Sequence, residues 1–384
     1  GKSSLYKPEE QSDQNLTLTQ QEFLNEIAEI HQRRSKLLEE KCKLYNFSQN
    51  LSKPQHALLL KAMSYNTPVW TCPVPKVATR FLGRMFAISS NYFREENVSS
   101  LGLLNITGAL SKSKFFQKYK AKDRAILMKY HRVLFVRHPF DRLISAYLDK
   151  MYGLGQWRGT SLDIIKTVRP NPSGYSLACG HDVTFLEFLK YVVMMPDKTN
   201  RHWTTVMSFC EPCAVHYDII GHTETAQDDI PYMSHMISSN VPPMSKDITN
   251  IENIKREVQK LFMPRFRPST ECNITFSQGY YRVWDVLKLH SYIDSNANIP
   301  PAHQILQNLT RVTLGTELRF RLQMKSFLKI VQDVMERTAV ELYHNRTVKE
   351  PIDLRKYYFN HIPNLLMAQL RERFKYDFEM FGYT

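Results

Sequence analysis

A lysine that follows an apolar run and precedes a helix-like pattern is the first group in this 384-residue chain with chemical potential. The stretch PVPKVATRF, residues 73–81, places Lys76 at that junction. Free backbone N–H groups at a helix start and a lysine ammonium both attract phosphate or sulfate. We therefore expect an anion cradle formed by Lys76, the Thr79 hydroxyl and the backbone of Val77, Ala78, Thr79 and Arg80. The stretch lacks the glycines of G-x-x-x-x-G-K-[ST], which disfavours ATP hydrolysis of the Walker type.

A second cation lies in RVLFVRHPFDRLISAY, residues 132–147. Arg137 is at the end of a predicted buried strand, Pro139 suits the first turn of a helix, and Ser145 lies in the second turn outside the apolar face. Ligands of open α/β sheets bind beyond the carboxyl ends of the strands, where a guanidinium can hold a phosphate through two hydrogen bonds. Taken alone, the stretch fits a second interpretation equally well. In that interpretation Arg137 pairs with a helix terminus or a carboxylate, and Ser145 is only solvated.

The elements around these cations alternate between strand-like and helix-like patterns. Strands are predicted within residues 68–76, 131–138 and 216–222, and helices over about 81–88, 140–151, 184–195 and 362–383. Strand-then-helix units predict an α/β fold with parallel strands and right-handed crossovers. Because 68–76 contains three prolines, either only part of it pairs in the sheet or it is an edge strand. Residues 20–44 predict a surface or stem helix.

Together the two cationic stretches predict two anion sites at strand ends, as a nucleotide with phosphates at its 5′ and 3′ positions requires. CPVPKVATRFLGRMF and VLFVRHPFDRLISAYLDKM resemble the 5′-phosphosulfate and 3′-phosphate motifs of the Golgi carbohydrate sulfotransferases. The closer group contains the chondroitin and dermatan 4-O-sulfotransferases. This chain departs from that group at residues 79–82, which read Thr-Arg-Phe-Leu where the group usually has Cys-Thr-Asn-Trp, so we interpret it as a divergent member.

Two more stretches are similar to this group, in the same order along the chain: HWTTVMSFCEPCAVHYDIIGHTET (residues 202–225) and the C-terminal YDFEMFGY. The resemblance covers roughly residues 56–230 and 351–384. It implies the sulfotransferase fold, a P-loop-like parallel sheet flanked by helices. We expect a stem over residues 1–55 and a catalytic domain over 56–384, with an unmatched insert at about 285–350.

The resemblance also implies a reaction. The sulfuryl donor would be 3′-phosphoadenosine 5′-phosphosulfate (PAPS) and the acceptor a sugar hydroxyl, with a glycosaminoglycan of chondroitin or dermatan type expected. Lys76 would neutralise charge on the bridging oxygen. Arg137 and Ser145 would hold the 3′-phosphate and so orient the donor. No metal is expected, because the sulfuryl group carries less charge than a phosphoryl group.

A general base should accept the proton of the sugar hydroxyl. His202 is the first choice, because Trp203 beside it could stack against a sugar ring. His181 and His138 are the competing candidates.

Composition indicates the partner and the compartment. The chain has 51 Lys and Arg against 37 Asp and Glu, a formal net charge of +14, which favours an acidic polysaccharide as partner. Eight N-x-[ST] sequons predict passage through the secretory pathway as a glycoprotein, at Asn15, Asn46, Asn50, Asn97, Asn105, Asn273, Asn308 and Asn345. We expect a type II protein of the Golgi lumen whose N-terminal membrane anchor precedes Gly1.

Six cysteines fit a disulfide framework, with 15 connectivities left open. A zinc site at Cys210, Cys213, His216 and His222 competes with this framework, but it is disfavoured because the second half-site is not spaced as in a zinc finger.

Three rival functions compete with sulfate transfer for the whole chain. A non-catalytic glycan-binding relative would retain the fold, whereas a nucleotide kinase lacks its Walker motif and a nucleic-acid-binding protein lacks any known module. Self-association through the stem is a further expectation.

Overall fold

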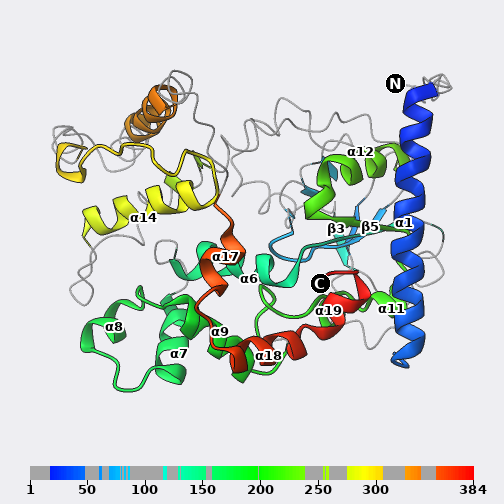
Figure 1. Cartoon of the computed structure of the whole chain (residues 1–384), viewed down its shortest axis with the longest axis horizontal. Helices are drawn as coiled ribbons and strands as arrows, with labels where there is room; N and C mark the ends of the chain where they lie inside the picture. The colour runs from blue at the N-terminus through cyan, green and yellow to red at the C-terminus, as the bar shows by residue number, and fades with distance from the viewer. Residues whose placement is uncertain are drawn as a thin grey trace, which may run out of the picture.

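The computed structural model describes residues 18–47, 60–62, 69–77, 79, 82–83, 85–86, 116–118, 129, 131–152, 158–197, 199–237, 254–255, 257–258, 275–305, 325–338 and 352–384. It contains a five-stranded sheet in the order β3-β1-β2-β4-β5, whose strands β3 and β5 are labelled in Figure 1. The strands are β1 (Leu60–Ala62), β2 (Val69–Cys72), β3 (Phe116–Lys118), β4 (His131–Val136) and β5 (Ile219–His222). The neighbours β2, β4 and β5 run parallel, which confirms the expected α/β class, while β1 and β3 add an antiparallel edge that was not predicted.

The prolines after β2 end its pairing without moving it to the edge. β2 pairs with β1 on one side and β4 on the other, and its last paired residue is Cys72. Because Pro73 and Pro75 have no N–H group to donate to a ladder, the strand stops there and the chain leaves the sheet. Residues 68–76 are therefore paired in part, and they do not form an edge strand.

The interior strand β4 is buried on both faces, as its continuous apolar run predicts. Residues Val133 to Val136 are at most 2% exposed. The Phe135 ring lies so close to Gly221 of β5 that a Cβ atom there would be 2.5 Å from it. Only glycine fits at this contact, which brings β4 and β5 together and aligns their carboxyl ends.

Helix α6 (Pro139–Tyr147) starts directly after β4 and continues into a π-helical turn, η2 (Leu148–Tyr152). The His138 side chain caps the helix by accepting a hydrogen bond from the Phe140 N–H. The apolar face of α6 packs in a second core cluster with α7 (Arg158–Val168), α9 (Phe185–Met194) and α18 (Asn364–Arg373). These helices gather below the sheet in Figure 1, together with α8 (Gly174–Cys179).

The predicted N-terminal helix is α1 (Leu18–Leu44), and it is part of the domain core. It lies along β5, α11 (Pro212–Val215), α12 (Ala226–Met236) and α19 (Lys375–Met380) (Figure 1). Its apolar residues Ile27 and Leu38 are buried against them. The buried side of α1 thus packs on the same chain, and self-association through this helix stays a prediction. The domain boundary at residue 55 stays a prediction.

The C-terminal segment forms two helices, α18 and α19, where one was predicted. The break falls at Phe374, whose buried ring occupies the core between them. The change of direction turns Asp377 of α19 inward, where it is 2% exposed. Its contacts connect the chain end to the site described below.

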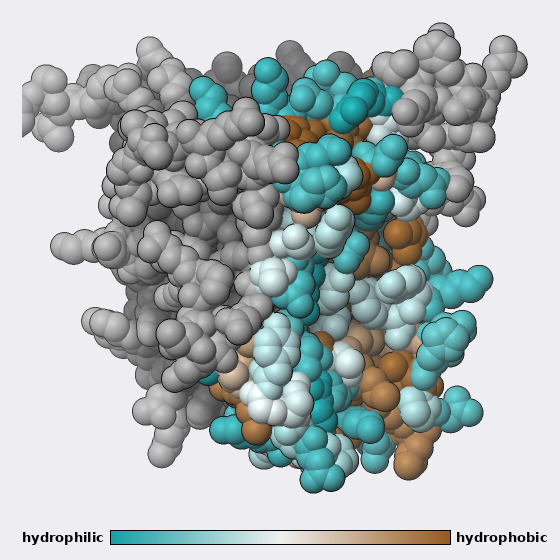
Figure 2. Space-filling view, turned by 90° about the vertical axis from the view of Figure 1, so that its left-hand side faces the viewer, coloured by the Kyte–Doolittle hydropathy of each residue, from teal (hydrophilic) through white to brown (hydrophobic). Residues whose placement is uncertain are grey.

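The region of the predicted insert contains α14 (Phe276–Leu289) and a helix over residues 325–338, which share a third apolar cluster. Arg282 of α14 donates to the His181 carbonyl oxygen over 2.7 Å, so this cluster rests on the helical part around α8. Figure 2 shows this side of the molecule, where apolar patches alternate with hydrophilic side chains. The insert boundaries stay a prediction.

One predicted glycan acceptor, Asn46, is described; it is exposed just after α1. Asn15, Asn50, Asn97, Asn105, Asn273, Asn308 and Asn345 lie outside the described residues. Within the described ranges, no helix combines the length and apolarity needed to cross a bilayer.

Candidate active site

The loop after β2 holds Lys76 in a strained backbone conformation. Lys76 has a φ of 73°, in the left-handed region that side chains other than glycine rarely occupy. Val74 and Val77 on either side are 0% and 1% exposed, which pins the loop to the core. Backbone strain of this kind persists only where its surroundings enforce it, and it concentrates at functional sites.

Thr79 and Val77, two of the residues predicted for the anion cradle, use their side chains to hold the loop in place. Thr79 donates its hydroxyl hydrogen to the Val74 carbonyl oxygen, so in this structure the hydroxyl closes the loop and does not face an anion. The side chain of Val77 is in the core, which leaves only its backbone for a ligand. Ala78 and Arg80 lie outside the described residues.

The Lys76 ammonium lies in a compact cluster of charges. Its Nζ is 2.7 Å from Oδ2 of Asp149, and Lys150 Nζ is 3.2 Å from the same oxygen. The three side chains are between 8% and 15% exposed. Asp149 and Lys150 belong to the π-helical turn after α6, an irregularity that is frequent at functional sites. The cluster carries two positive charges and one negative charge.

Arg137 is at the carboxyl end of β4, beside the Lys76 loop at the end of β2. Its Nη1 donates to the Lys76 carbonyl oxygen over 3.4 Å, and its side chain is half-buried. The fold thus brings together the two cations that the sequence predicted at strand ends, because β2 and β4 are neighbours in the sheet. Ser145 is half-buried in the second turn of α6, the helix that starts two residues after Arg137.

A buried guanidinium connects the Lys76 loop to the segment that contains His202. Arg142 is 2% exposed, and its Nε donates to the Pro75 carbonyl oxygen over 3.1 Å. Its Nη1 and Nη2 donate to the carbonyl oxygens of Thr204 and Arg201 over 2.6 and 3.2 Å. Burial lowers the pKa of Arg142 to about 10, so it stays charged at neutral pH.

His202 is held as a neutral imidazole next to the lysines. Its backbone N–H and its Nδ1 are 3.0 and 2.9 Å from Oδ1 of Asn200. Since this oxygen accepts from both, Nδ1 carries the proton and Nε2 has the lone pair of a base. Burial, and then the charges of Lys150 and Lys76, lower the pKa of His202 to about 3. These charges act on His202 only because it lies near them.

The two competing histidines have other environments. The ring of His138 is used on both sides, since Nδ1 accepts from the Phe140 N–H and Nε2 is 3.2 Å from the Thr384 carbonyl oxygen. Burial lowers the pKa of His181, followed by the charge of Arg282 from α14, and the His181 carbonyl oxygen accepts a hydrogen bond from Arg282. Of the three candidates, the geometry favours His202.

The predicted role of Trp203 in stacking on a sugar ring is wrong. Its side chain is 1% exposed and packs edge-on against Phe188 of α9, with ring centroids 5.3 Å apart. The ring belongs to the second core cluster, where no ligand reaches it. Trp203 instead anchors the His202 segment to the helices.

Two carboxylates hold the chain just after His202. Asp377 accepts hydrogen bonds from the N–H groups of Val206 and Met207, over 2.7 and 3.1 Å, at the start of α10 (Val206–Cys210). Its complete burial raises its pKa to about 6. Asp197 accepts from the Thr205 N–H over 3.1 Å. The C-terminal helix α19 therefore supports the candidate active site.

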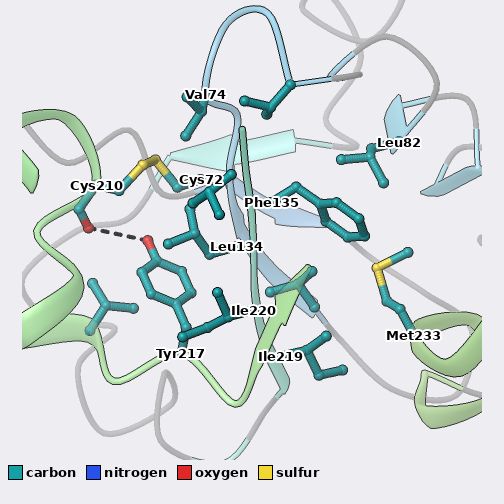
Figure 3. Close-up of a cluster of buried hydrophobic side chains, with 14 of the residues drawn as sticks. Cys72, Val74, Leu82, Leu134, Phe135, Cys210, Tyr217, Ile219, Ile220 and Met233 are labelled. Carbon is teal, nitrogen blue, oxygen red and sulfur yellow. Dashed lines mark hydrogen bonds between the residues drawn. A yellow bond between two sulfur atoms is a disulfide. The ribbon is translucent and has the colours of Figure 1, made fainter. Parts of the chain in front are cut away.

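The cysteines are in disulfides, so the zinc site considered at Cys210 and Cys213 is wrong. Cys72 at the end of β2 bonds to Cys210, and Cys42 of α1 bonds to Cys213. Figure 3 shows the first of these beneath the loop that contains Val74, with the Tyr217 hydroxyl donating to the Cys210 carbonyl oxygen over 3.1 Å. Cys179 is also disulfide-bonded, and Cys272 lies outside the described residues. Among the described side chains, no three or more His, Cys, Asp or Glu gather as metal ligands.

Sequence reasoning missed the residues that organise the site: Arg142, Asp149, Lys150, Asn200 and Asp377. Arg142 offered one signal, because it is a charged residue next to the apolar Leu143 and Ile144 of α6. Asp149 and Asp377 contact residues 73 and 171 positions away, which no periodicity reveals. Asn200 and Lys150 contact near neighbours in the sequence, but no motif marked them.

Comparison with known proteins supports the interpretation of these motifs. A model of the sulfotransferase family matches residues 62–263, which is more than half of the chain. Carbohydrate sulfotransferase 11 of Danio rerio is 31% identical over 229 residues, covering 57% of this chain and 64% of the relative. Carbohydrate sulfotransferase 14 of Homo sapiens is 39% identical over 109 residues, 27% of each chain.

A third relative, carbohydrate sulfotransferase 9 of Homo sapiens, is 27% identical over 230 residues, covering 59% of this chain and 52% of its own length. The chain therefore spans less than two thirds of the length of these relatives. No solved structure matches it significantly.

Proposed function

The chain belongs to the sulfotransferase family, and from this premise we propose that it is a carbohydrate sulfotransferase that uses PAPS as donor. The observation that carries the proposal is the position of Lys76 and Arg137 at the carboxyl ends of neighbouring parallel strands, joined by the 3.4 Å contact from Arg137 to the Lys76 carbonyl oxygen. The three relatives named above are all carbohydrate sulfotransferases, which supports the acceptor class.

The side chains at these strand ends fit a donor with two separated anionic groups. Lys76 and Lys150 would hold the 5′-phosphosulfate end, and Arg137 with the Ser145 hydroxyl would hold the 3′-phosphate. Bidentate binding by a guanidinium suits a terminal phosphate, while a lysine acts as a point charge. PAPS supplies the activated sulfuryl group; the residues of this chain bind and orient it.

Lys76 and His202 take part in the proposed transfer itself. As the sugar oxygen bonds to sulfur, the bond from sulfur to the bridging oxygen breaks, and adenosine 3′,5′-bisphosphate leaves. Lys76 neutralises the charge that grows on that oxygen. His202 accepts the hydroxyl proton at Nε2, because its proton is held on Nδ1 by Asn200.

The acceptor proposed is an acidic polysaccharide of the chondroitin or dermatan type. The net charge of +14 supports a polyanionic acceptor, and the resemblance of the two binding motifs supports this type. Consistent with that substrate, we propose the Golgi lumen as the location, with glycosylation at the exposed Asn46.

Transfer of radiolabelled sulfate from PAPS to desulfated chondroitin, dermatan and heparan tests the proposal. We expect transfer to a chondroitin or dermatan acceptor, and a loss of about 10²-fold or more in Lys76→Ala and Arg137→Ala. Lys166→Ala and Arg33→Ala, which change exposed residues of α7 and α1, are the matched controls.

A second candidate function, glycan binding without catalysis, is favoured by one observation: the Thr79 hydroxyl is engaged by Val74 and is not presented to a donor. Acceptor binding without transfer by the wild-type protein would establish this second function and reject the first.

A further inference from the structure

The carboxylate of Asp149 is shared between two lysines at the candidate active site. One oxygen, Oδ2, lies 2.7 Å from Lys76 Nζ and 3.2 Å from Lys150 Nζ. The Asp149 side chain is 8% exposed, so water screens these charges only weakly. A carboxylate at this position holds together two ammonium groups that would otherwise repel each other.

The local backbone explains why this carboxylate reaches Lys76. Helix α6 ends at Tyr147 and the next turn is π-helical, which widens the helix by one residue. The neighbouring residues Asp149 and Lys150 are both buried in this turn, at 8% and 9% exposure. Asp149 also acts on His202, since its charge opposes the lowering of that pKa by the lysines.

We infer that Asp149 is a positioning residue that holds Lys76 in place and competes with the anionic donor for its ammonium group. This inference rests on the proposed function. When a phosphate or sulfate oxygen approaches Lys76, it meets an ammonium that already has a carboxylate partner. Donor binding is therefore weaker than the two lysines alone would allow. In return, the contact with Asp149 fixes the position of the Lys76 ammonium before the donor binds.

The competing interpretation makes Asp149 the general base. Its Oδ2 is already occupied by both ammonium groups, whereas His202 is a neutral imidazole with its proton fixed on Nδ1. The geometry therefore assigns proton transfer to His202 and positioning to Asp149.

Binding of adenosine 3′,5′-bisphosphate, measured by titration calorimetry, tests the inference without any need for turnover. Asp149→Asn removes the competing charge at nearly constant volume. We expect its Kd for the bisphosphate to fall by about fivefold or more, while kcat for sulfate transfer falls as well. Asp149→Glu, which keeps the charge, should bind like the wild-type protein. Asp333→Asn, an exposed acid in the helix 325–338, is the control and should change neither value.

A purely structural role for Asp149 would not tighten binding. If Asp149→Asn is folded, by its melting temperature, and binds the bisphosphate no more tightly than the wild-type protein, the inference is wrong. If it does not fold, the pair Lys150→Gln and Asp149→Asn/Lys150→Gln gives the same comparison with one lysine fewer, and equal affinities in that pair would reject the inference.

The proposed function fails separately. A wild-type protein that binds no bisphosphate and transfers no sulfate overturns the proposed function and this inference together. A wild-type protein that binds it, with unchanged affinity in Asp149→Asn, overturns the inference alone.

Discussion

The guanidinium of Arg142 donates a hydrogen bond to the carbonyl oxygen of Pro75, the residue directly before Lys76. The same side chain reaches the carbonyl oxygens of Arg201 and Thr204, which flank His202. One buried residue thus sets the distance between the proposed donor-binding lysine and the proposed base.

Arg142→Lys should therefore impair catalysis more than stability. A lysine has one nitrogen and cannot reach three carbonyl groups in the geometry of a guanidinium. We expect kcat to fall by about 10²-fold through misplacement of Lys76 relative to His202, and the free energy of unfolding by about 1–3 kcal/mol for the unpaired carbonyls. Steady-state kinetics and denaturant unfolding measure the two effects, with Arg33→Lys as control. Equal losses of activity and folded fraction would contradict this role.

The pH dependence of the reaction should lack an acidic limb from His202. Its pKa is lowered to about 3, so in the free protein it stays deprotonated throughout the pH range from 5 to 7. The kcat/KM for donor, which reports the free enzyme, should be flat over that range. A limb with its midpoint near 6.5 that disappears in His202→Gln would contradict the assignment. In the same assay, Asn200→Ala should lower kcat by about tenfold or more, because it removes the hydrogen bond that orients the His202 imidazole.

His222 should make the fold sensitive to acid. It stacks on Tyr383, with ring centroids 4.8 Å apart, and its buried Nε2 has no hydrogen-bond partner among the described residues. Burial, followed by the charge of Arg34, lowers its pKa to about 4. The unfolded chain protonates this group below pH 6.5, whereas the folded protein does not until about pH 4. The unfolded state therefore binds more protons in this window, and stability is lost as the pH falls from 6.5 to 4, by about 3 kcal/mol.

Unfolding by urea at pH 7 and pH 4.5 checks this expectation. His222→Gln should flatten the dependence relative to the wild-type protein, and His361→Asn, which changes an exposed histidine, should not. An unchanged slope in His222→Gln would show that other groups cause the acid sensitivity.

The two disulfides should have separable effects. Cys42→Ala/Cys213→Ala releases α1 from α11 and should lower the free energy of unfolding by about 2–4 kcal/mol, with kcat of the folded protein retained. Cys72→Ala/Cys210→Ala releases the end of β2 from α10 and should lower kcat as well, because the Lys76 loop and the His202 segment flank this bond. Thermal unfolding and kcat, measured for both double variants, compare the effects. Equal kcat values in the two would contradict this division.

The sequence by itself determined the local elements of the site. Three local signals define these elements: the apolar run of β4, Pro139 at the first turn of α6 and the prolines that end β2. Each depends only on residues within a few positions of each other. These effects place Lys76 and Arg137 at strand ends, and parallel pairing then brings them together. The family motifs could be recognised from the sequence for the same reason, because each is a continuous stretch of residues.

Only the tertiary structure decided how the site is held and which histidine serves it. Asp149 reaches Lys76 across 73 positions, and Asp377 reaches Val206 across 171. The prediction for Trp203 is wrong because an aromatic residue beside a polar one looks alike in sequence whether it faces a ligand or the core. Pairing of the cysteines likewise depends on which elements pack together. Burial decides these cases, since it sets the pKa of His202 and the strength of every charge near it, and burial is a property of the packed chain.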